Sequence, residues 1–388
     1  MLLSHAEEAM LDGEMGEAVA RAMKVVVKVA EALDAPRLVR IEHAHISGVS
    51  YKNIGDSGLR LLKQMAELGA RVSVPSTVNP AGMDLNKWRD MGISESFARK
   101  QLEIIATLKK MGFKTTMTCT PYLYEKVERG SQVAWAESNA VLYANSVCSL
   151  YTNREGGPLA LMEAIVGRAP LVGYRLDENR AVTAVVDVGN IRKELDELQL
   201  YPLLGYYIGL SVGQGVPLIM GLQAPLSVSN LKLMLAAIGT SGSLALVKLG
   251  RAHVHESAEK ITVDSIKELL THSPTELSDE GAVMMGCPHL SPGELTYIAR
   301  IAAKYGKPRR RVVLFTARAA GRYSPRAVDV LKARGFEIYC DTCMVVSDLK
   351  SLGIDKVLVD SAKAAYYLLS QGYDVGMFLR KDLREILY

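Results

Sequence analysis

Cysteine is the residue type whose placement in this chain could do chemistry. Cys119 lies in TMTCTPY, Cys287 in GCPHLSPGE and Cys343 in CDTCMVV, three segments far apart in the sequence that each read as a loop. Three thiolates from distant loops can hold an iron–sulfur cluster by three corners and leave one iron open. An open iron can bind and polarise a substrate oxygen. This placement predicts a Lewis-acid enzyme.

The other two cysteines leave alternatives open. Cys340 forms a C-x-x-C with Cys343, a spacing typical of a thiol–disulfide pair or of half a zinc site. A zinc ribbon would need a second such pair, which the sequence lacks, and histidines at alternate positions are weak substitutes: His43, His45, His253 and His255. Cys148 follows small and apolar residues, which indicates packing. A redox or binding scaffold that uses the Cys340–Cys343 dithiol is therefore the competing hypothesis.

Two further segments concentrate hydrogen-bonding groups. The loop PSTVNPAG, residues 75–82, carries hydroxyl and amide groups between two prolines: Ser76, Thr77 and Asn79. The segment AWAESNAVLYANS, residues 134–146, interrupts an apolar stretch with three polar residues: Glu137, Ser138 and Asn139. A surface turn would explain the first segment, and a helix N-cap at Ser138 would explain the second. Both are candidates for the lining of a small polar pocket.

Composition excludes several classes of protein. Hydrophobic residues make up 49% and charged residues 23% of 388 residues, which is typical of a globular chain of two or three domains. The net charge of +4 gives no reason to expect nucleic acid or a membrane surface as partner. The sequence contains neither G-x-G-x-x-G nor GxxxxGK[ST], the glycine-rich phosphate-binding patterns.

The same features predict a cytoplasmic protein. The N-terminal MLLSHAEEAMLDGE is acidic and amphipathic, unlike a signal peptide. Five cysteines without dense spacing do not resemble a secreted disulfide framework. Residues 198–230 carry no charge, but prolines and glycines interrupt them, which favours buried core over a membrane span.

Alternating helix and strand signals indicate an α/β fold with loops gathered at strand ends. Helices are expected over residues 6–33 (broken near Gly13 and Gly16), 56–69, 94–112 and 325–334. Strands are expected over residues 38–41, 71–74, 115–118, 312–316, 337–339 and 357–359, with HAHISGVSYKN and PSTVNPAG as loops. Soft boundaries between subdomains are expected near residues 190 and 260. Ligands bind at the carboxyl ends of parallel strands. Asp360, Ser361 and Lys363 follow the expected strand 357–359 and are therefore candidate ligand-binding residues.

Several long motifs together resemble the aconitase X family: VPSTVNPAGMD, TMTCTPY, AWAESNAVLYANSV, TNREGGP, AIVGRAP, GCPHLSPGE and DTCMVV. The resemblance covers nearly the whole chain, from residue 43 to residue 363. It implies aconitase-like stacked α/β/α domains around a central iron–sulfur site. Residues 1–388 would form a catalytic large subunit, with the small swivelling domain on a separate subunit.

The resemblance also implies a hydro-lyase. One branch of the family dehydrates (R)-5-phosphomevalonate to trans-anhydromevalonate 5-phosphate in an archaeal mevalonate route to isoprenoids, with a large chain of about this length. The other branch dehydrates cis-3-hydroxyproline. A low content of Gln and Asn and many Arg, Glu and Lys residues suit a hot-living source and favour the archaeal branch. The base in this family is thought to be a serine on the small subunit.

Residue by residue, the resemblance implies that Cys119, Cys287 and Cys343 ligate a [4Fe–4S] cluster, with a [2Fe–2S] cluster or a single iron as alternatives. The residues that would line the substrate pocket are Gly48, Val49, Ser76, Thr77, Asn79, Glu137, Ser138 and Asn139. Asp360, Ser361 and Lys363 would form the far wall, with Lys363 as a phosphate partner. Cys148, Cys340 and the segment GRAHVHES depart from the family pattern, so no role is assigned to His253 or His255.

Overall fold

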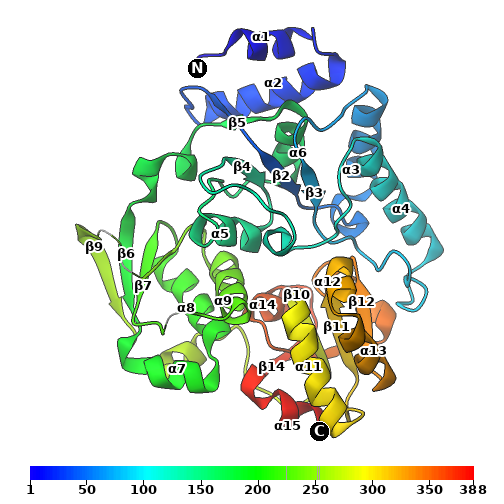
Figure 1. Ribbon diagram of the computed structural model, residues 1–388, viewed down its shortest axis with the longest axis vertical. Coiled ribbons are helices and arrows are strands. Elements are labelled where there is room, and N and C mark those ends of the chain that lie inside the picture. The colour runs from blue at the N-terminus through cyan, green and yellow to red at the C-terminus, as the bar shows by residue number, and fades with distance from the viewer. Residues whose placement is uncertain (224, 251, 253) are drawn as a thin grey trace. The chain divides into compact units, whose positions relative to one another are not determined.

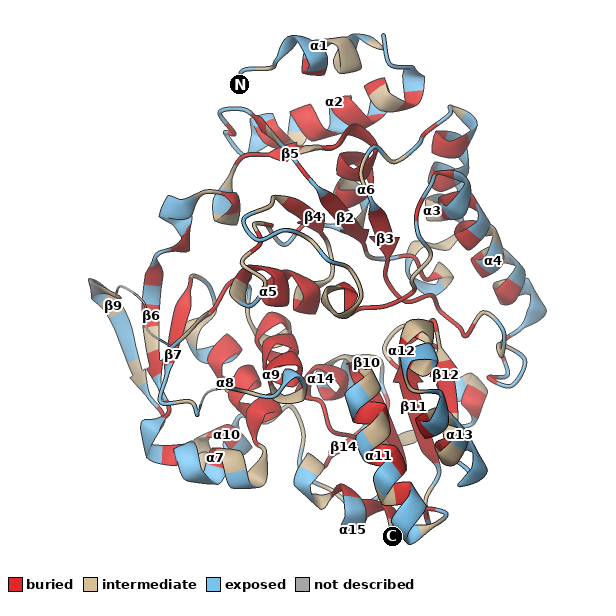
Figure 2. Cartoon of the chain, viewed as in Figure 1, coloured by how far each residue is buried: buried red, intermediate tan, exposed pale blue. Residues whose placement is uncertain are grey.

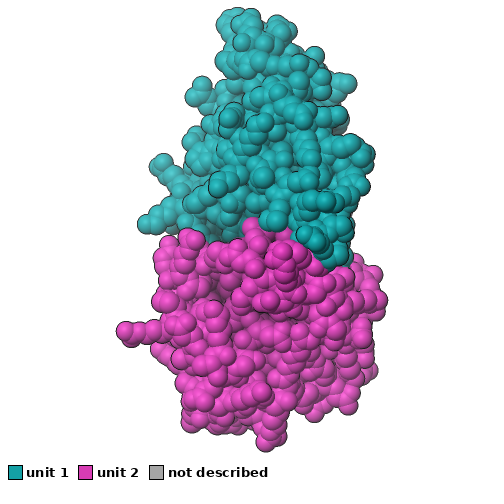
Figure 3. Space-filling view, turned by 90° about the vertical axis from the view of Figure 1, so that its right-hand side faces the viewer, with its two compact units in different colours: residues 1–82, 94–180 teal, residues 83–93, 181–388 magenta. Residues whose placement is uncertain are grey.

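The structure is a computed structural model that describes residues 1–223, 225–250, 252 and 254–388. The chain divides into two compact units (Figure 3). Unit 1 comprises residues 1–82 and 94–180, and unit 2 comprises residues 83–93 and 181–388. Each unit contains parallel sheets and helices, so the expected α/β class is confirmed.

Unit 1 is built on a three-stranded parallel sheet in the order β3-β2-β4 (Figure 1). A short antiparallel pair, β1 and β5, lies beside α2. The elements are α1 (His5–Asp12), α2 (Glu17–Ala32), β1 (Leu38–Arg40), β2 (His43–Ile46), α3 (Tyr51–Glu67), β3 (Ser76–Val78), α4 (Glu95–Lys110), β4 (Val133–Trp135), α5 (Ser138–Ser146), α6 (Gly157–Val166) and β5 (Arg168–Pro170).

The two central strands of unit 1 contradict the sequence prediction. His43–Ile46 and Ser76–Val78 lie in the expected loops HAHISGVSYKN and PSTVNPAG, yet both are fully buried strands. Both strands carry buried polar side chains, of which His45 and Thr77 bond to each other across the sheet. Such residues give no local apolar signal. The predicted strand at 71–74 is absent from this described segment. Residues 115–118 run beside β3 with a hydrogen bond from Thr118 N to Val78 O, but they form no ladder.

Unit 2 contains two parallel sheets, with strand orders β12-β11-β10-β13-β14 and β8-β7-β6-β9. Its elements in the first part are β6 (Val182–Asp187), α7 (Arg192–Leu198), α8 (Tyr201–Val212), β7 (Pro217–Met220), α9 (Val228–Ser241), β8 (Lys248–Leu249), β9 (Val254–Thr262) and α10 (Ile266–Thr271). In the second part they are β10 (Ala282–Leu290), α11 (Pro292–Tyr305), β11 (Val312–Thr316), α12 (Arg318–Tyr323), α13 (Pro325–Ala333), β12 (Glu337–Cys340), β13 (Lys356–Val359), α14 (Ala362–Ser370), β14 (Asp374–Met377) and α15 (Leu383–Leu387).

The five-stranded sheet confirms the predicted strands β11, β12 and β13 and the helix α13. Strands β10 and β11 are buried along almost their full length (Figure 2). Helices α11 and α13 pack on each other and against β10 and β12, whereas α14 packs on β13 and β14 and reaches α8 and α9. All strand pairs in this sheet are parallel, so the loops after β10, β12 and β13 leave from one edge.

The uncharged segment 198–230 contributes to the buried core of unit 2, as predicted. It supplies α8 and β7, and α8 packs against α9 and α10. None of the helices in the described part of the chain is long and apolar enough to cross a bilayer.

Candidate functional site

The carboxyl edge of the unit 1 sheet collects most of the predicted polar residues. Gly48 and Val49 follow β2, Asn79 follows β3, and Glu137 follows β4, while Ser76 and Thr77 lie on β3 itself. The parallel order β3-β2-β4 explains why segments that are distant in sequence converge there.

A chain of hydrogen bonds joins three of these strands. His45 on β2 lies with Nδ1 at 2.8 Å from Thr77 Oγ1 and Nε2 at 3.4 Å from Asn79 Oδ1. Asn79 Nδ2 donates to Glu137 Oε2 at 2.8 Å. With its oxygen toward the imidazole and its nitrogen toward the carboxylate, the Asn79 amide has one orientation that satisfies both neighbours. The network therefore fixes Asn79 and the half-buried Glu137 at the end of the sheet.

Both histidines of β2 are held neutral. Burial lowers the pKa of His45 to about 4, although Glu137 and the hydrogen bond to Asn79 oppose the shift. Burial, with the charges of His45 and Lys114, lowers the pKa of His43 to about 3. Trp135 Nε1 donates to His43 Nδ1 at 3.1 Å. The sequence prediction gave these histidines no role in this polar pocket.

Cys119 lies beside the same sheet edge and is 7% exposed. Its carbonyl oxygen accepts from Asn139 Nδ2 at 2.6 Å, and Tyr122 OH donates to Asn139 Oδ1 at 2.8 Å. The Tyr122 ring stacks on Tyr143 with centroids 3.7 Å apart. Asn139 in the first turn of α5 thus holds the backbone of the cysteine loop. Ser138 is the first residue of α5, and Glu137, not Ser138, occupies the N-cap position.

The loop after β2 contains Gly48 and Val49. Gly48 has φ +72, a conformation that favours glycine. The Val49 side chain is buried and lines an apolar cavity of about 130 Å³ with Ile46, Leu61 and Leu108. The Val49 carbonyl accepts from Gln101 Nε2 at 3.0 Å, which fixes the backbone of this loop.

Cys287 and Cys343 lie at the carboxyl edge of the five-stranded sheet of unit 2. Cys287 is 4% exposed and lies within β10, not in a loop as predicted, although the register with β11 is interrupted between Met285 and Leu290. Gly286 has φ +114, and a Cβ there would collide with the Phe315 carbonyl. The strand therefore bends out of its ladder at the cysteine.

Cys343 follows β12 and is 8% exposed. A hydrogen bond of 2.7 Å between His289 Nε2 and the Thr342 carbonyl connects the Cys287 segment with the residue before Cys343. Asp341 holds φ +64, a strained conformation for a residue with a side chain, and pairs with Arg318. Strain of this kind is characteristic of functional loops.

The third predicted group lies at the end of β13. Asp360 and Ser361 are each 1% exposed and Lys363 is 8% exposed. Ser361 caps α14 by accepting from Ala364 N at 3.2 Å, which places Lys363 in the first helical turn. Asp360 pairs through Oδ2 with Arg380, and its Oδ1 is a buried atom without a hydrogen-bond partner among the described residues.

Arg380 extends this group into a buried charge network. Its Nη1 donates to Glu294 Oε1 at 2.6 Å, and Glu294 also accepts from Lys232 Nζ at 2.5 Å. Burial would raise the pKa of Glu294, but Lys232 and Arg380 hold that pKa well below its usual range. Glu294 is therefore ionised at any physiological pH.

The dithiol alternative finds little support in the surroundings of Cys340. This residue is a free cysteine, and its backbone N–H donates to Asp84 Oδ2 at 2.7 Å. Burial, together with the charges of Asp341 and Asp84, raises the pKa of the Cys340 thiol to about 12. A neutral thiol is a poor nucleophile and a poor metal ligand. Cys148 is a half-buried free cysteine, and His253 and the His255 side chain lie outside the described residues.

Comparison with known proteins decides the family. Models of the first, second and third domains of aconitase X match residues 1–178, 182–269 and 281–385. The chain is 44% identical to the phosphomevalonate dehydratase large subunit of Methanothermobacter thermautotrophicus, over 94% of this chain and 93% of that protein. The chain belongs to the aconitase X family.

Other aconitase X proteins extend the comparison. The phosphomevalonate dehydratase large subunit of Thermococcus kodakarensis is 36% identical and is matched over 97% of both chains. A cis-3-hydroxy-L-proline dehydratase of Pseudomonas aeruginosa is 33% identical over 93% of this chain but only 65% of its own length. The crystal structure of the holo form of Thermococcus kodakaraensis aconitase X matches with a TM-score of 0.90, 34% identity and full coverage of both chains.

The donor chemistry of this aconitase X chain fits an iron–sulfur group. Cys119, Cys287 and Cys343 are buried, and each lies at the carboxyl edge of a parallel sheet. Thiolate is the ligand that such clusters use. Within neither unit, as far as the structure describes them, do three or more His, Cys, Asp or Glu side chains group around a metal position.

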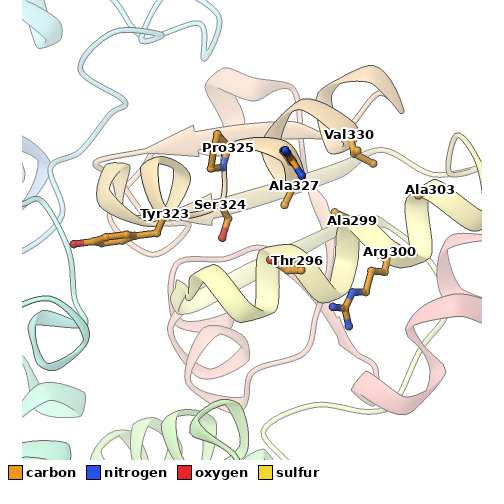
Figure 4. A pocket seen from close by; sticks show the side chains of 10 residues that line it. Thr296, Ala299, Arg300, Ala303, Tyr323, Ser324, Pro325, Ala327 and Val330 are labelled. Carbon is orange, nitrogen blue, oxygen red and sulfur yellow. The ribbon is translucent and has the colours of Figure 1, made fainter.

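A larger hollow of unit 2 lies away from these residues. A groove of about 450 Å³ runs between α11 and the α12–α13 segment and is lined by Thr296, Arg300, Tyr323 and Val330 (Figure 4). It contains none of the predicted site residues. Volume alone therefore does not identify the site.

Several site residues were missed from the sequence. His45, Tyr122, His289, Glu294 and Arg380 were given no role in the substrate pocket, although Tyr122 lies in TMTCTPY and both His289 and Glu294 lie in GCPHLSPGE. Within that motif Glu294 also forms a capping box with Ser291, which explains it locally. Lys232 did leave a signal: it is the only charged residue in the helix VSNLKLMLAAIGTS. A lone lysine in an apolar helix indicates either an exposed end or a buried ion pair.

Proposed function

We propose that this chain is the large subunit of a hydro-lyase that dehydrates (R)-5-phosphomevalonate to trans-anhydromevalonate 5-phosphate in archaeal isoprenoid biosynthesis. The observation that carries the proposal is its similarity, over nearly the full length of both chains, to phosphomevalonate dehydratase large subunits. Two polar sheet edges, each with buried cysteine, supply side chains suited to this chemistry. The cis-3-hydroxyproline dehydratases are more distant relatives.

The proposed cofactor is a [4Fe–4S] cluster held by Cys119, Cys287 and Cys343, and a [2Fe–2S] cluster or a single iron would use the same thiolates. When bound, the iron supplies Lewis-acid activation of the substrate hydroxyl. The chain itself contributes the burial of the three sulfurs. It also contributes the hydrogen bonds that hold the loops of Cys119 and Cys343.

The polar groups of unit 1 would bind and orient the hydroxy acid. Asn79 and Glu137 are already fixed in position by the chain that begins at His45. Gly48 and Val49 would contribute backbone groups, and Ser76, Thr77, Ser138 and Asn139 would complete the lining. A neutral His45 adds no positive charge to this pocket, so recognition there depends on hydrogen bonds.

The group after β13 would bind the phosphate. The first turn of α14 presents backbone N–H groups and the positive end of the helix dipole, and Lys363 adds a charge. Arg380 neutralises Asp360, which removes the repulsion that a free carboxylate would exert on a phosphate.

Dehydration removes the hydroxyl from one carbon and a proton from the carbon next to the carboxylate. The proposed base is a serine of a small subunit that carries the swivelling domain. This chain would hold the substrate so that the proton faces that serine. The expected location of the complex is the cytoplasm.

The deciding experiment begins with anaerobic preparation of the chain and measurement of iron and sulfide. The protein is then assayed with the small subunit on (R)-5-phosphomevalonate and on cis-3-hydroxyproline. Bound iron and turnover of the phosphorylated substrate are expected, and Cys119→Ser should abolish both. An iron-free chain that is fully active, or Cys119→Ser with undiminished turnover, would refute the proposal. Turnover of hydroxyproline alone would move the substrate assignment to the other branch.

A further inference from the structure

One lysine of unit 2 is buried in an otherwise apolar helix. Lys232 lies in α9, and its side chain is 0% exposed. An ammonium group loses its hydration on burial, and this loss is tolerated only where charged and hydrogen-bonded partners replace the water. A charge retained in such a place indicates a contact that an apolar residue would not make.

Lys232 connects the two cysteine segments of unit 2 through hydrogen bonds. Its Nζ donates to the backbone carbonyl of His289 at 2.6 Å. The ring of His289 in turn lies with Nε2 at 2.7 Å from the carbonyl of Thr342. His289 is two residues after Cys287, and Thr342 immediately precedes Cys343. A continuous path thus runs from α9 to both cysteines.

The other side of the lysine is anchored by charge. Glu294, in the first turn of α11, accepts from Lys232 at 2.5 Å and from Arg380 at 2.6 Å. Arg380 also pairs with Asp360. Two cations and two carboxylates therefore alternate and balance one another. The four members come from α9, from α11 and from the segments after β13 and β14. The ammonium of Lys232 therefore has little freedom to move away from the His289 carbonyl.

The sheet does not fix the cysteine separation by itself. The ladder between β10 and β11 is interrupted between Met285 and Leu290, the stretch that contains Cys287. Cys343 lies beyond the last residue of β12. Backbone that has left its ladder needs other contacts to hold a defined position.

We propose that Lys232 is a positioning residue that sets the separation of Cys287 and Cys343 by binding the His289 carbonyl. The inference rests on the proposed function, because it gives these two sulfurs a shared cofactor. Lys232 itself touches neither substrate nor iron. Its role is to keep two thiolates at ligand spacing before the cofactor arrives.

The test measures the separation of the sulfurs in metal-free protein. The full chain is prepared with Cys119→Ser, Cys148→Ser and Cys340→Ser, so that Cys287 and Cys343 are the remaining thiols. A short bifunctional thiol reagent is added, and the intramolecular cross-link is quantified by mass spectrometry. A high yield is expected in this background. If the reagent attaches to Cys287 or to Cys343 of this triple variant but does not link them, the two sulfurs have no defined short separation, and the proposal is overturned.

Lys232→Met is then introduced into this background, because methionine has similar length but no charge or donor. The cross-link rate is expected to fall at least tenfold. The matched control is Arg168→Met, which breaks another largely buried pair, with Glu7 at 2.8 Å in unit 1, and should leave the rate unchanged. An equal rate in Lys232→Met and the control would overturn the proposal.

A double variant distinguishes the positioning of the cysteines by Lys232 from the contribution of Lys232 to overall stability. Lys232→Met leaves two carboxylates, Asp360 and Glu294, beside Arg380. Adding Glu294→Gln removes the excess negative charge, so the melting temperature should recover in part, whereas the cross-link rate should remain low. If the rate recovers together with stability, the role of Lys232 is structural only and the proposal fails.

Measurement of bound iron distinguishes the proposed function from the positioning role of Lys232. In the wild-type cysteine background, Lys232→Met should take up less iron and lose it to a chelator at least tenfold faster than Arg168→Met. If the unmodified chain binds no iron but the cross-link result holds, the proposed function fails while the positioning role of Lys232 stands. Wild-type iron retention in Lys232→Met would overturn the positioning role alone.

Discussion

The three-stranded sheet of unit 1 and the five-stranded sheet of unit 2 hold the residues at their carboxyl edges by different interactions. In unit 1, hydrogen bonds among neutral groups join Thr77, His45 and Asn79, and they end on a single carboxylate, Glu137. In unit 2, buried ion pairs alternate from Lys232 to Asp360. A neutral network has directional contacts at small desolvation cost, which suits recognition of a ligand. A charged network has a high desolvation cost, and removing one of its members causes a large loss of stability. Such a network suits a rigid support.

The largest effect is expected from breaking the charged edge. Arg380→Met would leave Asp360 without its cation and Glu294 with only Lys232. Removing one member of a buried ion pair destabilises by about 3–5 kcal/mol. The free energy of unfolding from urea titration should fall by this amount. A loss below about 1 kcal/mol, the scale of an exposed pair, would remove the contrast between the two edges.

The neutral edge should instead be vulnerable to acid. Burial lowers the pKa of His45 to about 4, whereas in the unfolded chain the ring titrates near 6.5. The stability that depends on the neutral ring is complete above about pH 6.5 and is lost as the pH falls toward 4, by about 3 kcal/mol at roughly 1.4 kcal/mol per unit. His43, with its pKa lowered to about 3, adds to the loss over the same range and continues it below pH 4.

Fluorescence of Trp135 would follow this transition in unit 1, since Trp135 is buried beside His43 and the other tryptophan, Trp88, lies in unit 2. In a Trp88→Phe background, unfolding should become easier between pH 6.5 and 4. His45→Gln should reduce the slope of that part of the profile, and the contribution of His43 should remain. An unchanged slope in His45→Gln would show that other groups cause the acid sensitivity.

A smaller loss is expected at the cysteine loop of unit 1. Asn139→Leu would leave the Cys119 carbonyl and Tyr122 hydroxyl without this partner, and a buried unsatisfied group costs about 1–3 kcal/mol. Alkylation of Cys119 should also become faster. Tyr122→Phe is the matched control, because it keeps the stacked ring and removes one hydroxyl, which costs about 1 kcal/mol. Equal alkylation rates in both variants would argue against a role of Asn139 in holding the loop.

The two edges also differ in how well the sequence predicted them. Strands β11, β12 and β13 were predicted because each is a short apolar run bounded by charged, glycine or polar turn residues. Strands β2 and β3 were read as loops because HAHI and STV lack such a run. Their burial depends on partners that lie far away in the sequence, such as Trp135 for His43. The family motifs identified the polar residues at both edges even where the local strand prediction failed.

The contacts of the side chains that support the predicted residues could not be predicted from the sequence. Lys232 and Glu294 are separated by 62 positions and Arg380 and Glu294 by 86. A hydrophobic or helical period reports one face of one element and carries no information about such pairs. The sequence therefore named candidates at each edge, and the structure revealed the side chains that hold them.

A carboxylate behind the neutral edge should respond in the opposite direction to the histidines. Glu163 in α6 is fully buried beside Glu155, which already pairs with Arg175 at 2.6 Å. Burial, followed by the charge of Glu155, raises the pKa of Glu163 well above its usual value. The folded protein thus favours the protonated acid, and stability declines as the pH rises above about 4.3 toward the folded pKa.

Glu163→Gln is neutral at every pH and should remove this decline. At pH 7 the variant is expected to be more stable than the wild type by on the order of 1 kcal/mol, the usual scale for one substitution. Urea unfolding at pH 5 and pH 8 would measure the difference, which should be larger at pH 8. A destabilised variant at pH 8 would mean that the carboxylate form of Glu163 is required.

The smallest effect is expected at the opposite end of the charged sheet. Lys356, the first residue of β13, pairs with Glu280 at 2.5 Å, but their side chains are 42% and 70% exposed. Water and salt screen such a pair, and the side chains lose conformational freedom when they form it. Glu280→Gln should therefore leave the urea midpoint unchanged at moderate salt. Since Asp360 ends the segment that Lys356 begins, a clear loss of stability here would mean that ion pairs matter along the whole strand, and that the carboxyl edge is not a special support for the cysteines.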